Sequence, residues 1–90
     1  MEISNQQFEE ILKQIEQYKA DLIFQYEQKR NIVHVFWDAP MAMQIGAIEY
    51  SELLKEWYFV PNGQLPKNNS RQLVAMGYLT NGLNRATHGV

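Results

Sequence analysis

The chain contains no cysteine, little glycine or proline, and no long hydrophobic run. Without cysteine there is no disulfide, thiolate metal site or cysteine nucleophile, and a reducing cytoplasm is the expected compartment. The longest apolar run, Ala39–Met43, is five residues long and too short to cross a bilayer, so no membrane contact is expected. The N-terminus, Met1–Asn5, has neither a basic start nor an apolar stretch, so no secretory signal is expected. A net charge of −2 argues against a general polyanion binder.

What the chain does have is the composition and length of one small globular domain. Its 90 residues are 46% hydrophobic and 20% charged, a balance typical of a folded domain rather than a disordered or fibrous chain. No repeat, low-complexity tract or linker divides it, and the strongest loop composition, at residues 61–69, is followed by too few residues for a second domain. Residues 1–90 are therefore expected to form a single domain.

The first predicted element is an amphipathic helix. Ser4 and Gln7 have the spacing of a capping box, and Ile3 and Phe8 occupy the two positions of a hydrophobic staple. The apolar residues that then fall on one helical stripe are Phe8, Ile11, Leu12, Ile15, Tyr18, Leu22, Ile23 and Tyr26.

The end of this helix has two interpretations. A helix that continues to Gln28 would be about 36 Å long and would overhang a domain whose radius of gyration is about 12 Å. A helix that ends near Asp21 would leave Leu22–Glu27 as a strand, with a turn at residues 28–31, and would account for Phe24, which falls opposite the stripe. Because no Gly or Pro interrupts the helical periodicity, the sequence favours the long helix.

Three β-strands are predicted in the middle of the chain. Asn31–Trp37 is rich in β-branched and aromatic residues, Met43–Tyr50 is the second run, and Glu56–Val60 is the third. Gly46 indicates a bulge or a close backbone approach. Ser51–Lys55 is the predicted hairpin loop, and a short helix that begins in this loop is the alternative.

A second helix is predicted to begin at Ser70 and to end at Thr87–Gly89. Gly77 and Gly82 would weaken this helix but would let it press closely onto the sheet. The predicted order is α-β-β-β-α. It describes an α+β domain in which a three-stranded antiparallel sheet packs with a long N-terminal helix and a C-terminal helix.

No catalytic or metal-binding constellation is found in the sequence. His34 and His88 have no metal-ligand partners at the required spacing, so His34 is expected to fill the sheet, and neither a metal nor another cofactor is predicted. His34 and Asp38 would stand about 13 Å apart on a strand and could not act as a base and its orienting carboxylate. Serines occur where elements begin and are expected to cap them. A non-enzymatic protein is therefore expected.

The charge is unevenly distributed along the chain. Residues 1–28 carry a net charge of −4, residues 29–56 carry −1, and residues 57–90 carry +3. An anionic partner would therefore contact Lys67 and Arg71, and a basic partner would contact the first helix.

Aromatic residues gather on the predicted strands, which are apolar on both faces. Two helices can cover one face of such a sheet, so apolar surface would remain exposed on the other, and exposed apolar patches commonly bind partners. Methionines at the start of the second strand add adaptable side chains. The residues predicted to bind a partner are Trp37, Met41, Met43, Tyr50, Trp57, Tyr58, Lys67 and Arg71.

These patterns favour a small interaction protein that binds another protein through the aromatic sheet face and the first helix, with inhibition of that partner as a further hypothesis. The helical stripe also approximates a heptad seam, so a homodimer through the first helix is a further hypothesis. Small cysteine-free proteins of this type often occur in phages and mobile elements. The alternative is a nucleic-acid-binding module, because double-stranded-RNA-binding domains share the order α-β-β-β-α. Residues 68–72, however, carry a single arginine where such domains are lysine-rich.

Overall fold

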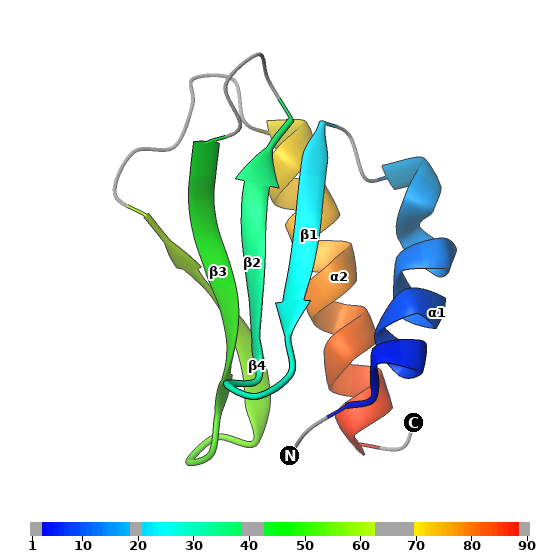
Figure 1. Ribbon diagram of the computed structural model, residues 1–90, viewed down its shortest axis with the longest axis vertical. Helices are drawn as coiled ribbons and strands as arrows, with labels where there is room; N and C mark the ends of the chain where they lie inside the picture. Colours follow the sequence, from blue (N-terminus) through cyan, green and yellow to red (C-terminus); the bar gives the residue numbers. More distant parts are fainter. Residues whose placement is uncertain (1–2, 19–20, 39–42, 63–69, 89–90) are drawn as a thin grey trace.

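The computed structural model describes residues 3–18, 21–38, 43–62 and 70–88, which form an α+β domain with two helices, a 3₁₀ turn and four strands. The elements are α1 (Asn5–Ile15), the 3₁₀ turn η1 (Glu16–Tyr18), β1 (Leu22–Glu27), β2 (Ile32–Trp37), β3 (Met43–Ser51), β4 (Glu56–Pro61) and α2 (Ser70–His88). The strands are antiparallel and lie in the sheet in chain order. Both helices lie on one side of the sheet, with α2 behind the strands and α1 beside α2 (Figure 1). The predicted α+β class, with an antiparallel sheet and one helix at each end of the order, is confirmed.

The prediction of a three-stranded sheet and a long first helix was wrong. The helix α1 ends at Ile15, and residues 22–27 form the edge strand β1, as in the alternative interpretation. Leu22 and Phe24 are buried on the helix-covered side of the sheet, whereas Ile23 and Gln25 alternate with them and are more exposed. Phe24, which does not fit the helical stripe, becomes a core residue because a strand turns every second side chain inward.

The first turn of α1 is fixed as the sequence predicts. The Ser4 hydroxyl oxygen accepts a hydrogen bond from the Gln7 backbone N–H at 3.1 Å, and the Gln7 side-chain oxygen accepts one from the Ser4 N–H at 2.8 Å. The Tyr26 hydroxyl, on β1, lies 3.0 Å from the Ile3 carbonyl oxygen, and the Phe8 ring stacks on the Tyr26 ring. These contacts hold the start of α1 against the first hairpin.

The hairpin between β3 and β4 is confirmed, so the alternative of a helix in this segment was wrong. Four turn residues, 52–55, connect the strands, and residues 28–31 connect β1 and β2 in the same way. Each turn ends on a residue with positive φ, Asn31 at 55° and Lys55 at 59°. Four-residue hairpin loops are commonly built on a type I turn, and the left-handed final residue brings the chain back into register.

Gly46 lies both at a β-bulge and at a close approach of two backbones, the two alternatives that the sequence indicates. The pairing of β2 with β3 shifts register between Val35 and Phe36, opposite Ile45 and Gly46. A Cβ atom on Gly46 would lie 2.5 Å from the Val60 carbonyl oxygen, so a side chain here would displace the β4 backbone. The bulge also places Ile45 in the core.

The core lies between the helices and the inner face of the sheet. The buried hydrophobic residues are Ile3, Phe8, Ile11, Ile15, Leu22, Phe24, Val33, Val35, Ile45, Ile48, Trp57, Ala75, Met76, Leu79 and Leu83. The close approach that Gly82 permits is to Ile11 of α1, because a Cβ atom on Gly82 would lie 2.8 Å from the Ile11 Cγ2 atom. The expected contact of this glycine with the sheet was therefore wrong.

Candidate binding surface

Trp57, predicted as a partner contact, is a core residue. Its side chain is 2% exposed, its indole Nε1 donates to the Thr87 hydroxyl oxygen at 2.8 Å, and its ring meets the Tyr50 ring edge-on at 5.5 Å. The physical reason is strand alternation, since Trp57 pairs with Tyr50 and both point toward the helices. Trp57 is therefore unavailable to a partner in the folded domain.

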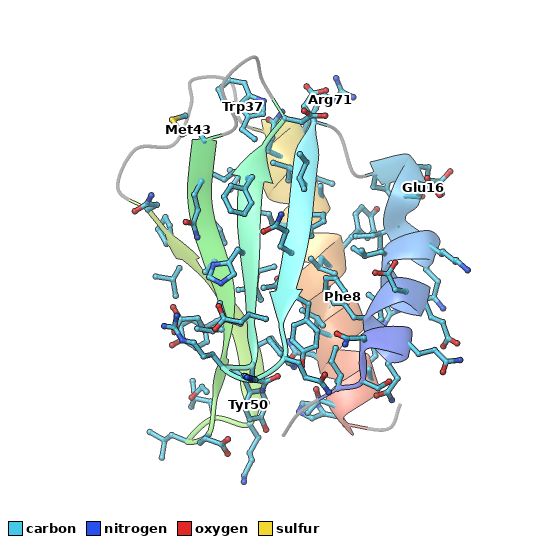
Figure 2. All side chains as sticks on the ribbon, viewed as in Figure 1. Phe8, Glu16, Trp37, Met43, Tyr50 and Arg71 are labelled. Carbon is cyan, nitrogen blue, oxygen red and sulfur yellow. The ribbon has the colours of Figure 1, made fainter. Side chains whose placement is uncertain are left out.

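The remaining predicted contacts are spread over different parts of the molecule. Trp37 and Tyr50 are half-buried against the core, at opposite ends of the sheet (Figure 2). Met43, the register partner of Trp37, is exposed beside it, and Arg71 is exposed at the start of α2. Tyr58 is exposed on the side of the sheet away from the helices. The two other predicted contacts, Met41 and Lys67, lie outside the described residues.

The heptad seam expected on the first helix does not form a surface. Phe8, Ile11 and Ile15 are buried in the core of their own chain, and Leu22 and Tyr26 belong to β1. Of the other seam residues, Leu12 is half-buried and Tyr18 is 41% exposed, and the homodimer stays a prediction.

Among the described residues, no helix or strand covers the side of the sheet away from the helices, and this side of β1 to β4 forms the candidate binding surface (Figure 1). Side chains that are in register on neighbouring strands form rows across this side. One row is Gln25–His34–Ala47–Val60, and a second is Glu27–Ile32–Glu49–Tyr58. Phe36 adds a shorter row, because it pairs with Ile23 on one side and with Gln44 on the other. We call these eleven residues the open face. Of them, Tyr58 alone was predicted as a contact.

A hydrogen-bonded polar group crosses the centre of the open face. The His34 Nε2 atom lies 3.1 Å from the Glu27 Oε1 atom, and the Gln44 Nε2 atom lies 3.1 Å from the His34 Nδ1 atom. In the tautomer that accepts from the Gln44 amide at Nδ1, the His34 Nε2–H donates to the Glu27 carboxylate. Arg30, from the β1–β2 turn, lies 3.4 Å from the other Glu27 oxygen. The three strands β1, β2 and β3 are thus joined through side chains as well as backbone.

The surroundings of the polar group are apolar and carry a small depression. Ile23, Ile32, Phe36 and Val60 are half-buried around it, and Tyr58 is 44% exposed. A hollow of about 180 Å³ lies beside Gln44 and is also lined by Ala47 and Val60. None of the strands β1 to β4 contains a lysine or arginine, whereas Glu27 and Glu49 lie on the open face. The strands of this face are therefore acidic.

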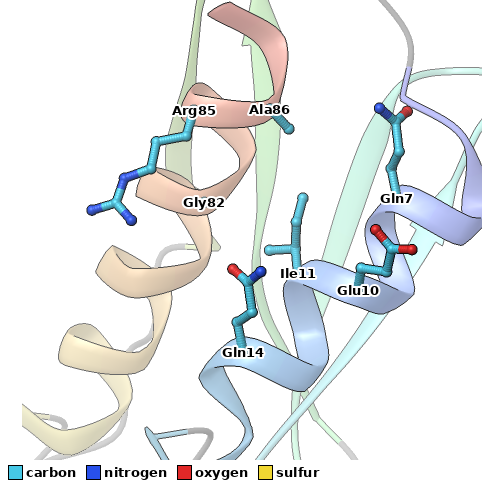
Figure 3. A pocket seen from close by; sticks show the side chains of 7 residues that line it. All are labelled: Gln7, Glu10, Ile11, Gln14, Gly82, Arg85 and Ala86. Atoms are coloured by element: carbon cyan, nitrogen blue, oxygen red, sulfur yellow. The ribbon is translucent and has the colours of Figure 1, made fainter. Parts of the chain in front are cut away.

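A second depression lies between the helices. It is a groove of about 370 Å³ in which Glu10 and Arg85 lie on different helices, above a floor that includes Ile11 and Gly82 (Figure 3). At its floor the Ile11 side chain occupies the space that a Cβ atom on Gly82 would need.

Neither surface contains an evident metal site or membrane segment. The described residues include no cluster of three or more histidine or carboxylate side chains that could hold a metal ion. In the same part of the chain, neither helix combines the length and the apolar character that spanning a bilayer requires.

The comparisons with known proteins give no relatives. The chain matches no known protein family, no curated protein and no solved structure.

The sequence missed most of the open face because its signal depends on strand pairing. Strand alternation places Ile32, His34 and Phe36 on one side of the predicted strand, but it does not say which side of the sheet the helices cover. If Leu22–Glu27 is taken as a strand, the apolar residues Leu22 and Phe24 indicate the side of the sheet that faces the core. Ile23 and Gln25 then lie on the opposite side.

Proposed function

We propose that the protein is a non-enzymatic binding module that docks another protein on the open face of its sheet. The observation that carries this proposal is an uncovered sheet face on which apolar side chains surround an ordered polar centre. An antiparallel sheet with one solvated side normally alternates apolar inward and polar outward residues. Here Ile32, Phe36 and Val60 lie on the outward side.

The arrangement has the composition of a protein interface. Aromatic residues such as Tyr58 and Phe36 supply large contact area and lose few rotamers on binding. Interfaces of this type also contain hydrogen bonds at fixed positions, and the His34–Glu27 and His34–Gln44 bonds already hold these side chains in place. Less side-chain entropy is then lost when a partner binds.

The charge of the open face favours a protein partner with a neutral or basic surface. Nucleic acid is not favoured, because phosphate contacts need lysine and arginine and the strands have none. The element order that suggested a double-stranded-RNA-binding module is also absent, since β1 makes the order α-β-β-β-β-α in the described residues. Inhibition of the partner, an origin in a phage or mobile element and a cytoplasmic location are parts of this proposal that rest on sequence composition alone.

The proposal is tested by affinity capture with a pair of matched variants. Tyr58→Thr combined with Ile32→Thr removes apolar surface from the open face and places threonine, a β-branched residue that favours strands, at both positions. The control is Leu73→Gln on α2, because Leu73 is 44% exposed, as is Tyr58. Wild-type protein and both variants are immobilised in parallel, with and without nuclease, and bound proteins are quantified by mass spectrometry.

We expect the wild type and Leu73→Gln to retain the same one or few proteins. The open-face variant should bind them with an affinity lower by about tenfold or more, which corresponds to about 1.4 kcal/mol. Retention that is unchanged in the open-face variant would exclude this face as the docking site. Retention that disappears with nuclease would support nucleic-acid binding instead.

A further inference from the structure

Glu49, on β3, lies on the open face between two apolar side chains. Its register partners are Ile32 on β2 and Tyr58 on β4, so the three side chains follow one another across the sheet. Side chains directly opposite each other on antiparallel strands have Cβ atoms about 4.5–5.5 Å apart, so one long side chain of a partner can contact all three. Glu49 and Ile32 are half-buried, and Tyr58 is 44% exposed. We call these three residues the Glu49 triplet.

Glu49 differs from the other carboxylate of the open face in its ion pairs. The Glu27 carboxylate is held by two groups, because one oxygen lies 3.1 Å from the His34 Nε2 atom and the other lies 3.4 Å from the Arg30 Nε atom. Among the described residues, no side chain forms an ion pair or a hydrogen bond with the Glu49 carboxylate. The charge of Glu49 is therefore uncompensated within the part of the chain that the structure describes.

The other basic residues near this end of the sheet lie away from the triplet. Lys29 and Lys55 are exposed in the turns that precede β2 and β4, and neither forms an ion pair with Glu49. Arg85 and His88 belong to the last turn of α2, which lies on the other side of the sheet (Figure 1). The positive charges are thus in the turns and on the helix, whereas the strand surface presents a carboxylate.

A protein that docks on the open face covers Glu49 together with its neighbours. Contact with Ile32 and Tyr58 removes water from the carboxylate between them, and burial of an ionised carboxylate without a partner is strongly unfavourable. A docking surface that is apolar or acidic at this point would therefore bind poorly. The partner has to supply a cation that donates hydrogen bonds to Glu49, and such a charge pair also fixes the orientation of the two proteins.

We propose that the partner places an arginine side chain on the Glu49 triplet, an inference that rests on the proposed function. The guanidinium group donates two parallel hydrogen bonds to the Glu49 carboxylate. The same planar group stacks on the neighbouring Tyr58 ring, and the methylene stem of the arginine packs on Ile32. Lysine fits less well, because its ammonium group is a compact, strongly hydrated charge without a plane that stacks on a ring.

The inference is tested with a defined probe, the capped tripeptide Leu-Arg-Leu, whose leucines can contact the apolar side chains around the triplet. In the matched probe, citrulline, which has the shape of arginine without its charge, replaces the arginine. Each probe is titrated into isotope-labelled wild-type protein, Glu49→Gln and Glu9→Gln, and the amide chemical shifts give the affinity and the place of binding. Glu9→Gln is the control, because it makes the same change of charge at an exposed position on α1.

We expect the arginine probe to shift the amide signals of Ile32, Glu49 and Tyr58 saturably, with a Kd in the millimolar range that is about tenfold lower than that of the citrulline probe. Glu49→Gln should abolish this difference and leave the affinity for the citrulline probe unchanged, whereas Glu9→Gln should change neither affinity. The two probes and the two forms of residue 49 make up a double-mutant cycle, which isolates the pairing of the carboxylate with the guanidinium.

Three results would overturn the inference: no shifts at the three amides, equal affinity for the two probes, or a preference for arginine that persists in Glu49→Gln. A failure of the proposed function is distinguishable, because it is measured by affinity capture with the variant that combines Tyr58→Thr and Ile32→Thr. Retained proteins that are lost in that variant but bind Glu49→Gln as they bind the wild type would exclude the arginine contact and leave the docking face in place.

Discussion

The Asn84 side chain on α2 pairs with both backbone polar groups of Trp57 on β4. The Trp57 N–H donates to the Asn84 Oδ1 atom at 2.7 Å, and the Asn84 Nδ2 atom donates to the Trp57 carbonyl oxygen at 3.4 Å. Trp57 lies on the strand at the edge of the sheet, where backbone groups have no neighbouring strand. One amide side chain therefore replaces a strand at this point and fixes α2 to the sheet.

Replacing this amide should destabilise the domain. Asn84→Ala leaves the Trp57 N–H and carbonyl without their partner, and we expect a loss of about 1–3 kcal/mol in the free energy of unfolding. Asn81→Ala, at an exposed position on the same helix, is the control and should change stability little. Denaturant unfolding followed by circular dichroism measures both. Equal stability of the two variants would show that the Asn84 bonds contribute nothing net.

Trp57 should prove structural. Trp57→Ala removes a buried indole, and we expect a loss of about 3–5 kcal/mol, a large part of the stability of a domain of this size. Trp57→Phe keeps most of the apolar volume but loses the hydrogen bond to Thr87, and should cost less. Thermal melting compares the two variants. A melting temperature unchanged in Trp57→Ala would contradict the placement of Trp57 in the core.

The two glycines of α2 should respond in opposite ways to alanine. Gly77 has open space where a Cβ atom would lie, so Gly77→Ala should stabilise the domain by about 1 kcal/mol through helix propensity. In Gly82→Ala the new methyl group meets the Ile11 side chain, whose branched Cβ limits its rotamers in a helix. Overpacking costs about 1–3 kcal/mol, so Gly82→Ala should destabilise the domain. Stabilisation of both variants in denaturant unfolding would show that α1 shifts freely away from α2.

Gln72 offers a place to gain stability. This α2 residue is 6% exposed, and its side-chain oxygen has no hydrogen-bond partner within the part of the chain that the structure describes. Gln72→Met replaces the amide with an apolar side chain of similar length and should raise the free energy of unfolding by about 1 kcal/mol. Gln17→Met, at an exposed position, is the matched control. A lower melting temperature in Gln72→Met would indicate that the amide has a bonding role.

Local signals in the sequence predicted the parts of the fold that local interactions determine. The Ser4–Gln7 capping box depends on residues three positions apart, and the hairpin turn at residues 52–55 depends on a few neighbouring ones. The second helix begins at Ser70, as its apolar spacing indicates. In each case the atoms that make the decisive contacts are close in the sequence.

The strand β1 could not be predicted in this way. Leu22 and Tyr26 satisfy a helical period, and Leu22, Phe24 and Tyr26 satisfy a strand period, so the same residues support both structures. The choice is made by pairing with β2, as in the register of Leu22 with Trp37, which no local window contains. The assignment of Trp57 to the core has the same origin, since β4 carries apolar residues on both sides and the position of α2 decides which side is covered.

Photo-crosslinking from the open face tests the central claim, that this face docks another protein, most directly. A photo-crosslinking phenylalanine derivative replaces Tyr58 on the sheet in one sample and replaces Leu73 on α2 in another. The side chains at these two positions are each 44% exposed. Cells that produce each protein are irradiated, and the adducts are identified by mass spectrometry. We predict a discrete adduct with one protein from position 58 and none from position 73. The same adducts from both positions, or adducts from position 73 alone, would contradict the claim.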